Sequence, residues 1–226
     1  MTKIKFINVK EGPPNAGSKV YTVQYFDENG NMTIRSGGTK AWRNTNPGNM
    51  TSRGGFATRH DSIGSAGGMA VFPTEEAGRQ ALIDLLKSSN YNILEVTELP
   101  EKYDKDNAQE YRRMLLSISK LDPNKRIKNL SGKEFDQLRA AIERIEGWES
   151  GQEDFIEKWY ISGVHKKHGV IVEYLVNKGN KTSWVTREEA LKFAIMSRLH
   201  VTIVHLKNGA LYLRPEYGNQ SFAQVV

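Results

Sequence analysis

The stretch AWRNTNPGNM, residues 41–50, combines a tryptophan, an arginine and three asparagines with a proline and a glycine. Proline fixes tight turns and glycine permits them, while asparagine tolerates turn conformations and its amide both donates and accepts hydrogen bonds. The stretch therefore predicts a rigid loop. Two interpretations of its amides follow from the residues: they cap the backbone of the loop itself, or they bind acetamido and hydroxyl groups of a sugar.

Three amphipathic helices are predicted after this loop. Thr74 has the position of an N-cap, and apolar residues recur from there at helical spacing to about Lys87. A second helix follows Asn107. A third begins at Ser131, which has a glutamate three residues later in the spacing of a capping box, and Gly147 suits its C-terminal cap.

Strand-forming residues flank the helical part. KVYTVQYF and MTIRS, joined by DENGN with its Asn29-Gly30 turn, predict a hairpin. After residue 156, paired strands around HKKHG, a helix that begins at Thr186 and a closing hairpin around Lys207, Asn208 and Gly209 predict a ββαββ module. The expected segments are a hairpin segment 1–38, a mainly helical domain 39–150 and a small α+β domain 156–226.

Composition excludes several classes of protein. The 226 residues contain no cysteine, which excludes disulfides, thiol catalysis and thiolate metal sites. No apolar run approaches the roughly 18 residues of a membrane span, so we expect no membrane partner. The net charge of +6 is spread along the chain and favours polyanions in general, and we do not expect nucleic acid as the partner. MTKIKFINVKEGPP has no legible secretory signal, so a role outside the cytoplasm would require another route of delivery.

Four stretches together resemble a family of lysozyme-like domains found in bacteriophage structural proteins and in effectors of contractile injection systems such as type VI secretion. They are WRNTNPGN, GGFATRHDSIGSAGGMAVFPTEEAGRQALIDLL, YDKDNAQEY and EGW, and the resemblance covers about residues 39–150. It implies a mainly helical lysozyme-like domain and an activity on peptidoglycan. The saccharide-binding residues that it implies are Trp42, Arg43, Asn44, Asn46 and Asn49.

The same resemblance implies where the protein acts and with what. It would be made in the cytoplasm and act in the periplasm or at the cell wall after delivery, with a delivery apparatus or an immunity protein as further partners. YISGVHKKHGVIVEYLV, followed by TREEA, resembles a small domain family of unknown function and adds a boundary without chemistry.

Glu146 is the first candidate catalytic residue. Glycosidic cleavage needs a carboxylic acid near the leaving oxygen, with its pKa raised by apolar surroundings. Glu146-Gly147-Trp148 resembles the helix-end glutamate of glucosaminidases and lytic transglycosylases, although there the glutamate precedes the asparagine loop and here it follows. The structural alternative makes Glu146 a surface residue, Gly147 a cap and Trp148 a core residue.

Other titratable residues have simpler explanations. Asp61 is the second candidate, as a base or a residue that positions water, and an Asx turn is its structural alternative. Asp104 and Asp106 lie in a charged loop, where exposure to solvent accounts for them. His165 and His168 lie in an expected hairpin turn without a clear carboxylate partner, and we expect neither a metal nor a cofactor.

The sequence thus predicts a muramidase-like hydrolase of peptidoglycan glycan strands, either a glycoside hydrolase or a lytic transglycosylase. The alternative is a non-catalytic wall-binding or structural protein, because a fold does not by itself imply chemistry.

Overall fold

The computed structural model describes residues 6–14, 17, 19–28, 30–53, 56–178, 181–196, 198–206 and 209–215. Asn29, Lys207 and Asn208, which we expected in hairpin turns, lie outside these residues. The chain divides into two compact units, Met1–Asp27 with Ile34–Asp154 and Glu28–Thr33 with Phe155–Val226. Most of the expected hairpin segment therefore belongs to the same unit as residues 39–150.

The prediction of a mainly helical, lysozyme-like fold is wrong. The protein is a mixed α/β structure with 35% helix and 33% strand, and its described strands form four sheets. Helical periodicity in the sequence is strong because each amphipathic helix is long. The unpredicted strands are short or polar, and they depend on pairing partners that lie elsewhere in the chain.

Two sheets contain the strands up to residue 156. One has the order β1-β2-β3-β6, and β4 pairs with β5 in an antiparallel hairpin. Pairing of β1 with β2 is also antiparallel. Buried residues from β2, β4 and β5 form a small core. The strands are β1 (Phe6–Gly12), β2 (Thr22–Asp27), β3 (Met32–Ser36), β4 (Gly64–Ala66), β5 (Met69–Val71) and β6 (Gln152–Ile156), and the core residues are Val23, Tyr25, Ala66 and Val71.

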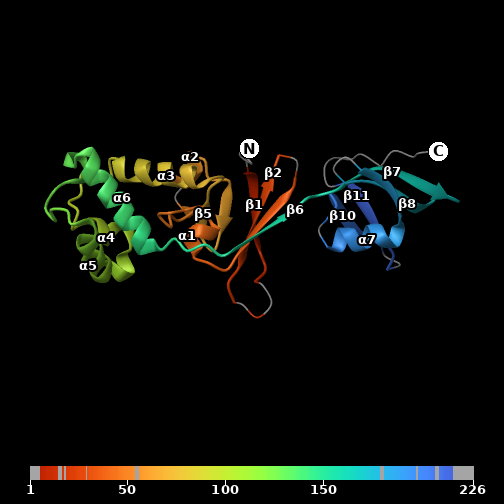
Figure 1. Ribbon diagram of the computed structural model, residues 1–226, viewed down its shortest axis with the longest axis horizontal. Helices are drawn as coiled ribbons and strands as arrows, with labels where there is room; N and C mark the ends of the chain where they lie inside the picture. Colours follow the sequence, from red (N-terminus) through yellow and green to blue (C-terminus); the bar gives the residue numbers. More distant parts are fainter. Residues whose placement is uncertain are drawn as a thin grey trace. The chain divides into compact units, whose positions relative to one another are not determined.

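The helices of the first unit gather around a larger apolar core, and α3, α4, α5 and α6 lie together at one end of this unit (Figure 1). Leu82, Leu115 and Ile142 are fully buried there. The bounds are α1 (Lys40–Arg43), α2 (Phe56–Arg59), α3 (Glu75–Lys87), α4 (Leu99–Tyr103), η2 (Lys105–Asn107), α5 (Ala108–Ser119), η3 (Ile127–Asn129) and α6 (Gly132–Glu146).

The predicted helix starts after Thr74 and Ser131 are confirmed. The Thr74 hydroxyl accepts a hydrogen bond from the Ala77 amide at 3.1 Å, and Ser131 forms a capping box. α6 ends at Glu146, and Gly147 follows with a φ of 75°, a conformation that favours glycine. These caps fix both ends of α6, and its last residue is the candidate acid.

The asparagine loop packs directly against α3. A Cβ atom on Gly78 would lie 2.1 Å from the backbone oxygen of Thr45, so only glycine allows this approach of helix and loop. On the loop itself, a Cβ atom on Gly48 would lie 2.7 Å from the Tyr103 hydroxyl. The glycines of NPGN and EEAG therefore let α3, the loop and Tyr103 meet.

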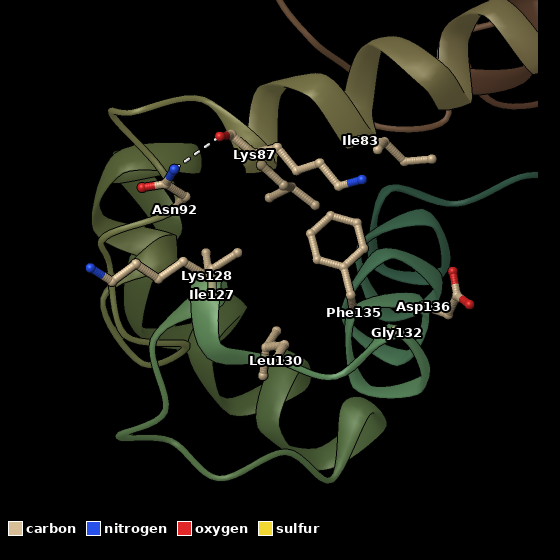
Figure 2. A pocket seen from close by; sticks show the side chains of 10 residues that line it. Ile83, Lys87, Asn92, Ile127, Lys128, Leu130, Gly132, Phe135 and Asp136 are labelled. Atoms are coloured by element: carbon tan, nitrogen blue, oxygen red, sulfur yellow. Dashed lines mark hydrogen bonds between the residues drawn. The ribbon is translucent and has the colours of Figure 1, made fainter.

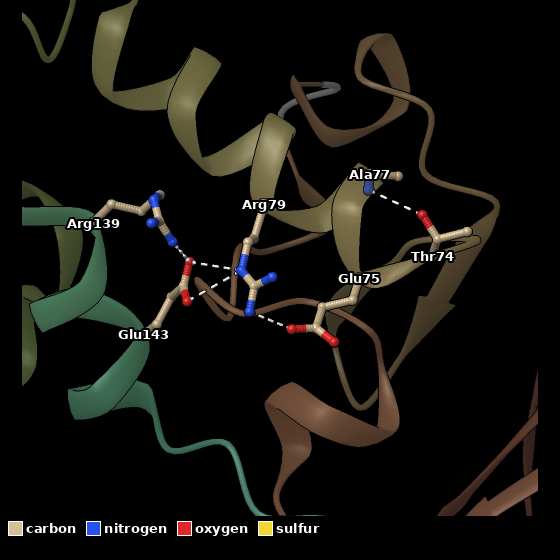
Figure 3. A network of polar contacts seen from close by, with 6 residues as sticks. All are labelled: Thr74, Glu75, Ala77, Arg79, Arg139 and Glu143. Carbon is tan, nitrogen blue, oxygen red and sulfur yellow. Dashed lines mark hydrogen bonds and ion pairs between the residues drawn. The ribbon is translucent and has the colours of Figure 1, made fainter. Parts of the chain in front are cut away.

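Charged residues join α3 to α6 close to the C-terminal end of α6 (Figure 3). The Glu143 carboxylate accepts hydrogen bonds from Arg79 Nε at 3.3 Å and from Arg139 Nη1 at 2.5 Å. Arg79 also pairs with Glu75 in the first turn of α3. This network fixes the last turn of α6 against α3.

The second unit is a small α+β module, and the predicted ββαββ order is wrong because a third strand precedes its helix. Strands β7, β8 and β9 form an antiparallel sheet, and β10 pairs with β11. The predicted helix start at Thr186 is confirmed by a capping box. The expectation that His165 lacks a carboxylate partner is wrong. Glu173 lies opposite it on β8, and its Oε2 is 3.0 Å from His165 Nδ1. The bounds are β7 (Tyr160–Lys167), β8 (Val170–Lys178), β9 (Lys181–Thr186), α7 (Arg187–Ile195), β10 (Val201–His205) and β11 (Leu211–Pro215).

Candidate active site

Glu146 and Asn49, which are 97 positions apart in the sequence, meet in the structure. The Asn49 amide nitrogen donates to Glu146 Oε2 at 3.1 Å. The hydroxyl of Tyr111, on α5, donates to Glu146 Oε1 at 2.9 Å. Both carboxyl oxygens are therefore held, one from the asparagine loop and one from a neighbouring helix.

The surroundings of Glu146 favour its protonated form. Burial raises the pKa of this carboxyl group above its ordinary value, and the hydrogen bonds from Asn49 and Tyr111 offset part of that effect. Asp104 raises the pKa further through charge repulsion, and Lys40 lowers it. Glu146 also lies at the C-terminal end of α6, where the helix dipole disfavours a negative charge. A held carboxyl group with a raised pKa is suited to donating a proton.

Two tyrosines, one bonded to Glu146 and one packed against the first, hold this carboxyl group in place. Tyr111 is 2% exposed, and burial raises its pKa far above the ordinary value, so its hydroxyl remains a donor. The ring of Tyr103 packs against that of Tyr111 with centroids 5.7 Å apart. The Tyr103 hydroxyl donates to the backbone oxygen of Gly48, which lies next to Asn49. The tyrosine pair thus ties α4 and α5 to the asparagine loop.

A cleft of about 300 Å³ adjoins these residues. Asn49 and Tyr103 form part of its wall, and Tyr91 adds another aromatic ring. Arg53 and Lys102 also line it, and no acidic residue does. The cleft therefore combines aromatic surface, an amide and positive charge, which suits a sugar that carries anionic substituents. Glu146 does not itself line the cleft, and Asn49 connects the cleft wall to it.

Asn44 and Asn46 lie inside the protein and are 0% exposed. The Asn46 amide nitrogen donates to the backbone oxygens of Met50 and Ala70 at 2.8 and 3.0 Å, and its oxygen accepts from the Met50 amide. Asn44 donates to the Ala66 oxygen at 2.9 Å. These amides form hydrogen bonds with backbone groups, which agrees with the interpretation that they cap the backbone. They are not available to a sugar in this conformation.

Trp42 and Arg43 are also buried, at 7% and 4% exposure. The Arg43 guanidinium donates to the backbone oxygens of Gly37 and Gly38, so it stabilises the bend before α1. The edge of Trp42 reaches a second cavity of about 350 Å³, which Trp148 also lines. Of this pair, only Trp42 retains a position from which it can contact a ligand.

Asp61 occupies an exposed turn before β4 with a φ of 64°. Aspartate is among the few residues that adopt this left-handed conformation readily. The conformation agrees with the turn interpretation. Its neighbour His60 faces Asp84 on α3, at 3.1 Å.

Tyr111, Tyr103 and Asp104 are the residues of this site that sequence reasoning missed as functional. All three come from the stretch YDKDNAQEY. Asn107, predicted as an N-cap, has that position but makes no capping bond with its side chain. Its amide instead donates to the Asp104 carboxylate at 3.2 Å. The signal in the sequence is the pair of tyrosines that flank the polar residues of this stretch. From the sequence alone the aspartates are interpreted as solvent-exposed charges, so no site is predicted there.

A third cavity, of about 500 Å³, lies between α3, η3 and α6 (Figure 2). The ring of Phe135 faces it, with the Lys87 amine 5.3 Å from the ring centroid. Aliphatic side chains make up much of the lining, and Glu146 is not part of it. The charged residues of its lining are Lys87, Lys128 and Asp136.

The described residues contain no group of three or more histidine, aspartate or glutamate side chains placed to hold a metal ion. None of their helices has the length and apolar character to cross a membrane. No known family model matches the chain, and no curated protein matches it in sequence.

Proposed function

We propose that this protein cleaves the glycan strands of peptidoglycan, with Glu146 as the general acid. The observation that carries the proposal is the hydrogen bonding of Glu146 by Tyr111 and by Asn49, which also lines a cleft. A held, partly buried carboxyl group with a raised pKa is what protonation of a glycosidic oxygen requires. The resemblance of WRNTNPGN and its companion stretches supports peptidoglycan as the substrate.

In this mechanism Glu146 donates its proton to the leaving oxygen as the bond to the anomeric carbon breaks. Asn49 and Tyr111 keep the carboxyl group oriented before and after the transfer. Because the acid must be protonated, activity falls as the pH rises through the raised pKa of Glu146. Arg53 and Lys102 provide positive charge for the carboxylates of the peptide stems.

The test is digestion of purified peptidoglycan by the wild type and by Glu146→Gln, with released fragments identified by mass spectrometry. We expect the wild type to release glycan fragments and the variant to lose activity by about 10²- to 10⁴-fold, the usual contribution of general acid catalysis. Glutamine keeps the shape of the side chain and its hydrogen-bonding oxygen, so the fold should persist.

Glu110→Gln is the matched control, because Glu110 lies on the exposed surface of α5 and pairs with Arg113. It should digest peptidoglycan like the wild type. A wild type that binds peptidoglycan and releases no fragments would contradict the proposal and favour the non-catalytic wall-binding alternative.

A further inference from the structure

Two carboxyl groups accept hydrogen bonds from residues at the start of α5. Asn107 is the N-cap of this helix, and Tyr111 lies in its first turns, four positions later. The Asn107 amide donates to Asp104 at 3.2 and 3.3 Å, and the Tyr111 hydroxyl donates to Glu146 at 2.9 Å. Neighbouring donors at the start of α5 therefore hold Asp104 and Glu146, and the charge of Asp104 raises the pKa of Glu146.

Two residues that line the cleft link it to Asp104 and Glu146, which do not line it themselves. Tyr103 precedes Asp104 in the chain and lines the cleft, as does Asn49, which donates to Glu146. The Tyr103 and Tyr111 rings are in contact between them. Asp104 is partly exposed, and no described cation forms an ion pair with it. It is thus a carboxylate with access to water, and its charge acts on the held carboxyl group of Glu146.

We infer that Asp104 is the catalytic base that activates the attacking water, an assignment that rests on the proposed function. Glycosidases that act by inversion place two carboxyl groups several ångströms apart with room for one water between base and sugar. The different settings of the two groups match this division: Glu146 is held by donors in a partly buried site, and Asp104 faces solvent.

The reaction is a hydrolysis in which Glu146 acts on the leaving group and Asp104 acts on the attacking water. Glu146 gives its proton to the leaving glycosidic oxygen, and the bond from that oxygen to the anomeric carbon breaks. A water oxygen bonds to the anomeric carbon from the opposite face, and Asp104 takes the proton that this water loses. The product hemiacetal has the inverted configuration, and one water is consumed.

The experiment compares Asp104→Asn with Asp106→Asn in the full chain. Asp106 lies two positions away, is exposed and belongs to the same short helix as Asn107, so it is a matched control. Asparagine at 104 keeps an oxygen that can accept from Asn107. We expect Asp104→Asn to lower kcat on peptidoglycan by about 10²- to 10⁴-fold with little change in KM, and Asp106→Asn to leave both unchanged.

Two readouts separate a base from a structural residue. Azide, a small anion that needs no deprotonation, should partly restore turnover by Asp104→Asn and yield a glycosyl azide. Proton NMR of the first wild-type product should show the inverted anomer. A retained anomer, an anhydro-sugar product or an Asp104→Asn variant with wild-type kcat would each overturn the assignment while leaving the Glu146 proposal in place. An inactive wild type would overturn both.

Discussion

Asn46 and Asn49 lie in one loop, but their amides bind different groups. Asn46 is enclosed and its three hydrogen bonds all go to the backbone, whereas Asn49 is partly exposed and donates to the Glu146 carboxyl group. The loop therefore combines residues that stabilise it with one that acts on the candidate acid. Substitutions at the two positions should separate stability from activity.

We expect Asn46→Ala to lower the free energy of unfolding by about 3 kcal/mol, because it removes three hydrogen bonds to buried backbone groups. Asn49→Gly should change it by less than about 1 kcal/mol, since the φ of 45° at this position suits glycine. Without the Asn49 hydrogen bond, the pKa of Glu146 should rise further, so the alkaline limb of the activity profile should move to higher pH. Urea unfolding and pH–rate profiles measure the two effects, and equal stability losses would contradict this division.

Ionisation of Glu146 should reduce the stability of the protein. Its folded pKa is raised by burial, so the stability that the protonated form provides is present below the unfolded pKa and is lost as the pH rises through the folded pKa. Glu146→Gln carries no charge and avoids this loss. Its Tm relative to the wild type should increase between acidic and neutral pH in thermal unfolding, and a pH-independent difference would count against a buried, ionisable Glu146. Glu110→Gln should show no such trend.

At this scale the sequence predicted Glu146 as a candidate acid and Asn49 as a candidate sugar-binding residue, and it did not predict their contact. Glu146 and Asn49 have local signals, a helix end before glycine and an asparagine in a turn. The role of Tyr111 depends on how α5 packs against α6, and the burial of Asn44 depends on β4, so neither is visible in local spacing.

The contact between α3 and the asparagine loop makes a sharp prediction at the scale of elements. Alanine usually stabilises a helix interior by about 1 kcal/mol relative to glycine. Gly78→Ala should instead destabilise the protein by about 1–3 kcal/mol, because its Cβ would meet the Thr45 backbone oxygen. Gly132→Ala, where nothing lies within 4 Å, is the control and should be neutral or slightly stabilising. Chemical denaturation of both variants measures this, and a stabilised Gly78→Ala would disprove the close approach.

The elements that the sequence predicted well are helices whose capping residues and apolar periodicity are visible in their own sequence. α3 and α6 have caps and apolar stripes that specify their starts within a few residues. β4 and β5 are three residues each, and β9 is a polar strand whose partner β8 defines it. Strands of this kind require knowledge of the pairing, which is why the fold class was predicted wrongly.

At the scale of the whole molecule, the candidate site residues are confined to one of the two units. Glu146, Asp104 and the cleft all belong to the first unit. The second unit has its own core around Tyr174 and Val176. Each unit therefore has an apolar core of its own.

Thr39 connects the start of α1 to the chain that leaves α6. Its amide donates to the Glu149 oxygen at 3.0 Å, and its hydroxyl accepts from the Glu149 amide at 3.1 Å. The segment 39–149 therefore begins and ends at one point, which is the geometry that circular permutation needs. A chain closed there and opened at the exposed Asn124 would carry α6 ahead of the asparagine loop, with Glu146 and Asn49 still in contact. The order of acid and loop along a chain is thus free to differ between proteins that build the same pair.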